Sequence, residues 1–141
     1  MIVNEVMNKN VVVVKGDATL KQASEVMAKT RIGSLIVVEG AKIAGIITSS
    51  DIIKSIAQDK VPANTLIEEV MSKRVFTVNP DTSIEDAVEK MVDNKIRELP
   101  VVQNNKIKGI LTVTDIAVVE PKLISSIAQL LSMQFPGYRG G

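Results

Sequence analysis

The pattern of apolar and polar positions along the chain predicts strands that alternate with amphipathic helices. Two runs rich in β-branched residues, 11–14 and 75–78, predict strands, and each is followed by a turn that contains Asp. Apolar residues then recur at helical spacing, which predicts one helix with a single apolar face in each half of the chain. The positions on these faces are Leu20, Ala23 and Met27 in the first half, and Ile84, Ala87, Val88 and Met91 in the second.

Local signals mark where these two helices should begin and end. Thr19 with Gln22 fits a capping box, and Ser83 with Asp86 is a weaker version of it. The first helix should end near Thr30 and Arg31 and the second near Asn94 and Lys95, with basic residues in the last turn.

A β-hairpin and a short helix should follow in each half. Turns are expected at Glu39-Gly40 and at Asn104-Asn105. The predicted element order is β-α-β-β-α, twice, in an α/β (α+β) fold. The expected hairpin strands are 35–38 with 42–47 and 99–102 with 106–111, and the expected last helices are 51–58 and 115–119.

The chain is also an internal duplication. Shifting the 141-residue sequence by 64 positions aligns residues 6–52 with 70–116 without a gap and gives 20 identities in 47 pairs. The predicted organisation is a first repeat at 1–58, a connector at 59–65, a second repeat at 66–120, an amphipathic helix at 121–133 and a disordered tail at 134–141. The apolar stripe of that last helix would comprise Leu123, Ile124, Ile127, Leu130 and Leu131.

One motif occurs in both repeats, where a buried strand should pass into a helix. It is Gly-Ile-x-Thr-x-x-Asp, from Gly45 to Asp51 and from Gly109 to Asp115. In α/β folds, ligands bind at such junctions because helix N–H groups point into the crevice. The alternative is purely structural, since a Thr followed three positions later by an acid is also a helix N-cap worth about 1 kcal/mol. The two interpretations are compatible.

Composition narrows the function classes. The net charge is only +1, so nucleic acid is not an expected partner, and there is no run of about 18 apolar residues to cross a membrane. The sequence has no Cys and no His, which removes the commonest metal ligands and the commonest general base. No phosphate-binding P-loop motif is present. We therefore expect a cytoplasmic protein that is not an enzyme, holds no metal and requires no cofactor.

These features together resemble the tandem cystathionine β-synthase (CBS) domain pair, also called a Bateman module. The resemblance rests on Val-Met near the start of each repeat, on residues 94–102, and on the two Gly-Ile-x-Thr-x-x-Asp motifs. It implies two β-α-β-β-α repeats packed face to face with pseudo-two-fold symmetry. It also implies two clefts between the repeats that bind an adenosyl ligand such as AMP, ADP, ATP or S-adenosylmethionine.

The resemblance further implies roles for individual residues. Asp115 and Asp51 would contact the ribose hydroxyls, and Arg97 would meet phosphate in the Asp115 cleft, where the first repeat has Gly33. The phosphate-side donors would be Thr112, Thr114, Thr48 and Ser50, and the adenine walls would be Asn10, Val11 and Val12 for one cleft and Arg74, Val75 and Phe76 for the other. Because Gly33 offers no side chain, we predict that a phosphorylated ligand fills the Asp115 cleft first.

Two functions stay open at this level. The first is a regulatory module that senses an adenosyl ligand and acts on a partner protein, whose identity the sequence does not give. The second is a dimerisation or interaction scaffold with vestigial clefts. In either case we predict a C2 homodimer, because the apolar stripe after Pro121 has no obvious partner within the pair.

Overall fold

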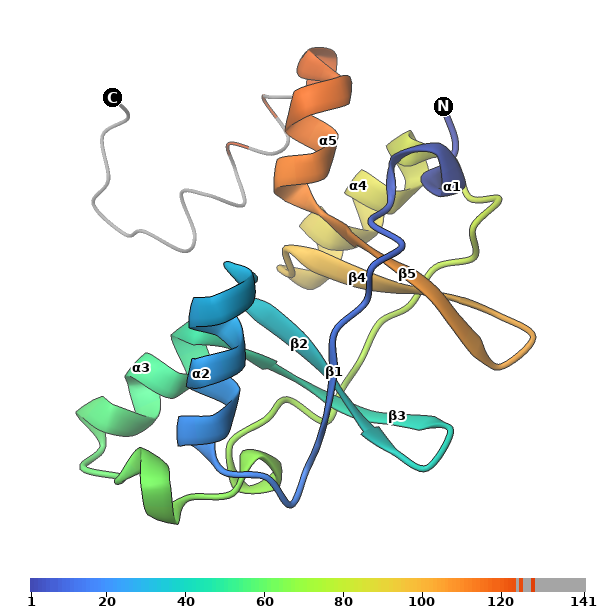
Figure 1. Ribbon diagram of the computed structural model, residues 1–141. Coiled ribbons are helices and arrows are strands. Elements are labelled where there is room, and N and C mark those ends of the chain that lie inside the picture. Colours follow the sequence, from blue (N-terminus) through green and yellow to red (C-terminus); the bar gives the residue numbers. More distant parts are fainter. Residues whose placement is uncertain (124, 126–127, 129–141) are drawn as a thin grey trace. The chain divides into compact units, whose positions relative to one another are not determined.

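The structure, a computed structural model, describes residues 1–123, 125 and 128 and forms two compact units (Figure 1). One unit is Val11–Val75. The other combines Met1–Asn10 with the described residues from Phe76 onward. The predicted apolar positions Ile124, Ile127, Leu130 and Leu131, and the tail at 134–141, lie outside the described residues.

The Val11–Val75 unit is built on a three-stranded sheet in the order β1-β2-β3. β1 (Val13–Lys15) pairs in parallel with β2 (Ser34–Glu39), which pairs antiparallel with β3 (Lys42–Thr48). The helices are α2 (Leu20–Thr30) and α3 (Ser49–Ala57), with short 3-10 turns at Pro62–Asn64 and Ile67–Glu69. The core of this unit comprises Leu20, Ala23, Met27, Leu35, Val37, Ile47, Ile52 and Ile67.

The other unit repeats this plan around β4 (Glu98–Gln103) and β5 (Lys106–Thr112), which form an antiparallel hairpin. Its helices are α1 (Val3–Val6), α4 (Ile84–Asn94) and α5 (Val113–Val119), followed by a 3-10 turn at Pro121–Leu123. Its core draws on the N-terminal segment as well as on the second repeat. It comprises Val3, Val78, Ile84, Ala87, Val88, Met91, Leu99, Val101, Leu111, Val113 and Ile116.

The predicted local signals are largely confirmed. Thr19 and Gln22 form a full capping box, and the Ser83 side chain accepts a hydrogen bond from the Asp86 N–H. The hairpin strands match the predicted ones to within a residue, although the first turn falls at residues 40–41 rather than 39–40. The fold is the expected mixed α/β arrangement of two β-α-β-β-α-like repeats.

One predicted strand is reduced to a single bridge. Residues 75–78 form no strand, and Val78 alone pairs in parallel with Val101. The Val78 N–H donates to the Pro100 carbonyl (3.1 Å), and the Val102 N–H donates to the Val78 carbonyl (2.9 Å). The next rung toward residue 76 would need an N–H at residue 100, and proline has none. In the first repeat this position is Ile36, and the ladder there extends to three pairs.

In each unit, a segment from the start of the other repeat crosses the hairpin. In the unit of Met1–Asn10, Asn8 and Ile110 exchange two backbone hydrogen bonds of 2.9 Å. In the Val11–Val75 unit, Ser72 and Ile46 exchange the same pair, at 3.0 and 2.9 Å. The N-terminal segment and residues 66–74 therefore play the same structural part, one in each unit.

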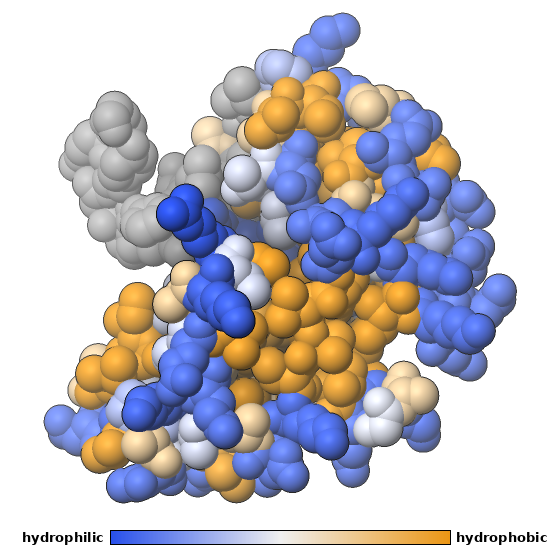
Figure 2. Space-filling view, in the orientation of Figure 1, coloured by the Kyte–Doolittle hydropathy of each residue, from blue (hydrophilic) through white to orange (hydrophobic). Residues whose placement is uncertain are grey.

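Several apolar side chains stay exposed in the Val11–Val75 unit. Figure 2 shows apolar surface in the region of its sheet. Val13 of β1 is 46% exposed. On α3, Ile53 is 67% exposed and Ile56 is 52% exposed. Since these two lie three residues apart on a helix, they occupy the same face. The two side chains thus form an exposed apolar pair on α3.

Candidate functional site

The hydroxyl–acid motif of the second repeat forms the junction between β5 and α5. The Thr112 Oγ1 accepts from the Asp115 N–H (3.2 Å), and the Asp115 Oδ2 accepts from the Thr112 N–H (3.2 Å). This reciprocal capping box makes Thr112 the N-cap and Asp115 the third residue of the helix. The helix therefore begins at Val113, two residues before the predicted start.

The first repeat has the same construction between β3 and α3. The Thr48 Oγ1 accepts from the Asp51 N–H (3.2 Å), and the Asp51 Oδ2 accepts from the Thr48 N–H (2.9 Å). Here too the helix begins two residues earlier than predicted, at Ser49, with Ser50 in its first turn. The N-cap interpretation of the motif is thus confirmed for both copies. Each box uses one oxygen of a carboxylate that has lone pairs for several more hydrogen bonds.

The backbone just before the hairpin lies against the start of each final helix. The Val113 N–H donates to the Arg97 carbonyl (3.0 Å), and the Ser49 N–H donates to the Gly33 carbonyl (2.9 Å). Arg97 and Gly33 thus hold equivalent places beside the two junctions. Arg97 is a half-buried residue with a cationic side chain, while Gly33 has no side chain. The two units therefore differ in the residue whose carbonyl accepts from the start of the final helix.

The residues predicted as adenine walls fall where the chain passes from one unit to the other. Asn10 belongs to the unit of Thr112, Thr114 and Asp115, and its N–H donates to the Asn8 Oδ1 (2.9 Å). The rest of that wall, Val11 and Val12, belongs to the Val11–Val75 unit.

The second predicted wall divides in the same way. Arg74 and Val75 belong to the unit of Asp51, and Phe76 to the unit of Asp115. Each unit therefore contains one hydroxyl–acid junction and part of the wall predicted for it.

The motif glycines have a role that the sequence analysis missed. Both lie inside strands, as expected, and each is beside a β-bulge. A Cβ on Gly109 would stand 2.7 Å from the Met7 Sδ and 2.8 Å from the Asn8 carbonyl oxygen. A Cβ on Gly45 would stand 2.6 Å from the Ser72 carbonyl oxygen. Spacing within one repeat could not reveal this role, because Met7 of the first repeat meets Gly109 of the second, and Met71 of the second meets Gly45 of the first.

Two further observations bear on function. In the part of the chain that the structure describes, no cluster of three or more Asp and Glu is placed to hold a metal ion. Across the same residues, no helix combines the length and the apolar character needed to cross a membrane.

The sequence and fold match known proteins over most of the chain. The CBS domain family model matches residues 3–58 and 67–121. An uncharacterized protein of Methanopyrus kandleri is 38% identical over 130 residues, which are 90% of this chain and 66% of that protein. The CBS domain-containing protein YhcV of Bacillus subtilis is 34% identical over 82% of this chain and 83% of its own length. The chain also matches a part, about a quarter or less, of several archaeal homoserine O-acetyltransferases, such as that of Methanococcus vannielii.

Solved structures give the same assignment. The CBS domain pair of protein MJ0100, in complex with 5′-methylthioadenosine and S-adenosyl-L-methionine, is 30% identical with a TM-score of 0.80. The match covers 86% of this chain and 97% of that one. A conserved CBS domain protein from Thermoplasma acidophilum is 27% identical with a TM-score of 0.85, covering 98% and 79% of the two chains. With two matched domains and this fold, the chain belongs to the CBS domain family and contains a CBS pair, or Bateman module.

Proposed function

We propose that this CBS pair is a regulatory module that senses an adenosyl compound and acts on a partner protein. The observation that carries the proposal is the geometry at α5, where the Asp115 carboxylate is fixed in the first turn and Arg97 lies beside the helix start. An ionised carboxylate can accept from two vicinal ribose hydroxyls, and a guanidinium can bind phosphate in a bidentate manner. The related CBS pair that binds S-adenosylmethionine and methylthioadenosine supports this ligand class.

The proposed ligand is AMP, ADP, ATP or S-adenosylmethionine. Asp115, Thr112, Thr114, Arg97 and Asn10 would contact it in one unit. Their counterparts in the other unit are Asp51, Thr48, Ser50, Gly33 and Arg74, and the backbone of Val11, Val12, Val75 and Phe76 would contact the adenine. We propose binding and signalling rather than catalysis, since these groups include no nucleophile with an adjacent base.

The two units should bind phosphorylated ligands unequally. Arg97 provides a charge-assisted contact that Gly33 lacks, and such a contact is worth about 1.5–3 kcal/mol. This corresponds to a roughly ten- to a hundredfold difference in affinity. We therefore propose that ATP or AMP occupies the Asp115 site before the Asp51 site.

Calorimetric titration of four variants tests this order. Asp115→Asn keeps an oxygen for the capping box but removes the charge, and Asp51→Asn is its matched control. Asp115→Asn should weaken ATP binding much more than Asp51→Asn does, and Arg97→Ala should weaken ATP more than adenosine. Gly33→Arg should raise the ATP affinity of the second site, because Gly33 has ordinary backbone geometry and an added Cβ would meet only the Ser49 Oγ, at 3.4 Å.

The reverse order of the two Asp variants would refute the assignment, and equal losses would show that Arg97 does not contact phosphate. A thermal melt tests the ligand class itself. A ligand at about 100 times its Kd stabilises by roughly 2.7 kcal/mol, which should raise the midpoint by roughly 5 to 15 °C. If AMP, ADP, ATP and S-adenosylmethionine all leave the midpoint unchanged at millimolar concentration, the sensor proposal is wrong.

The second candidate function is a dimerisation scaffold with vestigial ligand sites. The exposed pair Ile53 and Ile56 on α3 favours a protein contact in either case. A related hexameric CBS-CP12 protein from bloom-forming cyanobacteria, 30% identical over 88% of this chain with a TM-score of 0.79, shows that a member of the family assembles. We propose a C2 homodimer for this chain. Nucleotide released when the purified protein is denatured would favour the sensor over the scaffold.

A further inference from the structure

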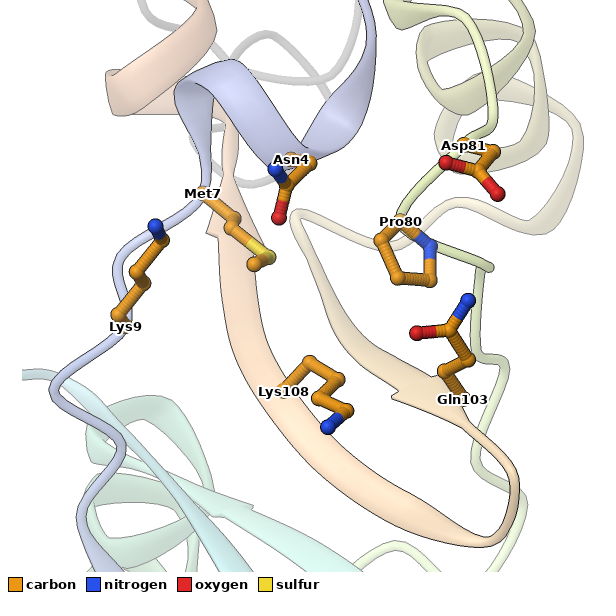
Figure 3. A pocket seen from close by; sticks show the side chains of 7 residues that line it. All are labelled: Asn4, Met7, Lys9, Pro80, Asp81, Gln103 and Lys108. Atoms are coloured by element: carbon orange, nitrogen blue, oxygen red, sulfur yellow. The ribbon is translucent and has the colours of Figure 1, made fainter.

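A cavity lies in the unit of Met1–Asn10, at the turn end of its hairpin and away from the α5 junction. Its volume is about 370 Å³, and it is drawn in Figure 3. Side chains from the N-terminal segment, from the loop before α4 and from both hairpin strands line it. They are Asn4, Met7, Lys9, Pro80, Asp81, Gln103 and Lys108.

The walls of this cavity are held by the backbone. α1 is attached to the loop before α4, because the Val3 N–H donates to the Thr82 carbonyl (2.8 Å) and the Asn4 N–H donates to the Pro80 carbonyl (2.9 Å). On the strand side, Val101 pairs with Gly109 and Val102 pairs with Ile107. Lys108 is therefore the extra residue of a β-bulge, and such residues are re-aimed relative to a regular strand.

The polar groups of the cavity carry a net positive charge. Lys9 and Lys108 contribute two cations and Asp81 one anion, while Asn4 and Gln103 contribute amide donors. Among the residues that the structure describes, no ion pair engages Lys9, Lys108 or Asp81. The side chains around this open cavity thus include two exposed ammonium groups, two amides and one exposed carboxylate.

The duplication supplies an internal comparison. The positions 64 residues away in the other unit carry the opposite charge balance, since Lys108 is replaced by Ala44, Gln103 by Glu39 and Asn4 by Glu68. Lys9 and Asp81 keep their charges there, as Lys73 and Asp17. The net charge of these positions is +1 in one unit (two Lys, one Asp) and −2 in the other (one Lys, one Asp, two Glu). The shared fold therefore does not require the basic set.

We propose that this cavity binds a small oxyanion with two or more negative charges, of the phosphate or polycarboxylate class. The attraction of two lysines and one carboxylate to an anion grows with the charge of that anion, so monocarboxylates should bind more weakly than multiply charged oxyanions. The site is distinct from the adenosyl site, because Lys108 lies four residues along β5 from Thr112, roughly 13 Å at the rise of a strand. It does not depend on the function proposed above.

Titration of the full chain with inorganic phosphate and with citrate tests the proposal. The variants exchange residues for those of the other unit, namely Lys108→Ala and Gln103→Glu, so the fold should accept them. One lost charge-assisted contact should weaken citrate binding about tenfold. The double variant should lose binding, and Lys106→Ala should behave as wild type because that exposed lysine does not line the cavity. Added NaCl should weaken binding, because salt screens exposed charges.

Four outcomes would overturn the inference. The first is that neither anion binds the wild-type chain. The second is equal thermal stabilisation of wild type and double variant, since excluded salts stabilise any fold. The third is an equal loss in Lys106→Ala, which would indicate general surface charge. The fourth is loss of citrate binding in Asp115→Asn, which would place the anion at the α5 junction. Retained ATP binding in the double variant would separate the two sites.

Discussion

Replacing Gly109 by alanine should destabilise the protein far more than a single added methyl group suggests. The new Cβ would stand 2.7 Å from the Met7 Sδ and 2.8 Å from the Asn8 carbonyl oxygen, both closer than real Cβ contacts. The Met7 thioether can rotate away because it ends a flexible side chain. The Asn8 carbonyl belongs to the backbone and is held by the two hydrogen bonds between Asn8 and Ile110. The clash with the new Cβ can therefore be relieved only if the N-terminal segment moves away from β5.

The expected cost follows from these two contacts. Overpacking of a well-packed site costs about 1–3 kcal/mol. Lifting the segment also weakens two backbone hydrogen bonds, each worth roughly 0.5–1.5 kcal/mol. We expect a total loss of about 2–4 kcal/mol, which for a chain of this size lowers the thermal midpoint by roughly 6 to 12 °C.

Urea unfolding followed by circular dichroism measures this loss, with two glycine controls. Gly45→Ala should cost about as much, because its Cβ would stand 2.6 Å from the Ser72 carbonyl oxygen. Gly33→Ala should change little, since its nearest neighbour, the Ser49 Oγ, lies 3.4 Å away. If Gly109→Ala stays within about 0.5 kcal/mol of wild type, the crossing segment does not enforce glycine, and this explanation of the motif fails.

Two further predictions concern backbone strain and assembly. Lys95 ends α4 with a φ of 55°, so Lys95→Gly should stabilise the protein by about 0.5–1 kcal/mol. Lys29→Gly inside α2 should destabilise it by a similar amount. A destabilised Lys95→Gly or a stabilised Lys29→Gly in urea unfolding would disprove this. Light scattering should give twice the chain mass of 15.2 kDa. Ile53→Glu should yield a folded monomer with a lower thermal midpoint, because it loses the stabilisation by the partner subunit. A monomeric wild type at tens of micromolar would rule out the dimer.

Much of the fold could be predicted from the sequence because its signals are local. Capping at Thr19 needs only Gln22 three residues later, and the Asn104-Asn105 turn needs only two residues that accept a positive φ, observed at 52° and 62°. The duplication also meant that the elements of one repeat could be checked against those of the other. The hydroxyl–acid junctions are also local features, because the capping box between Thr112 and Asp115 spans only four residues. Their presence could be predicted from spacing alone, although the helix starts were placed two residues late.

The tertiary structure decided the features that depend on partners distant in sequence. Gly109 must be glycine because Asn8, about a hundred residues earlier, crosses its strand. Residues 75–78 form no strand because Pro100 lacks the N–H that the next backbone hydrogen bond would need. The units also do not follow the repeats, since Asn10 belongs to the unit of Asp115 and Val11 to the other unit. Periodicity and capping rules act over a few residues, whereas these outcomes depend on steric exclusion and hydrogen-bond pairing between segments that only the folded chain brings together.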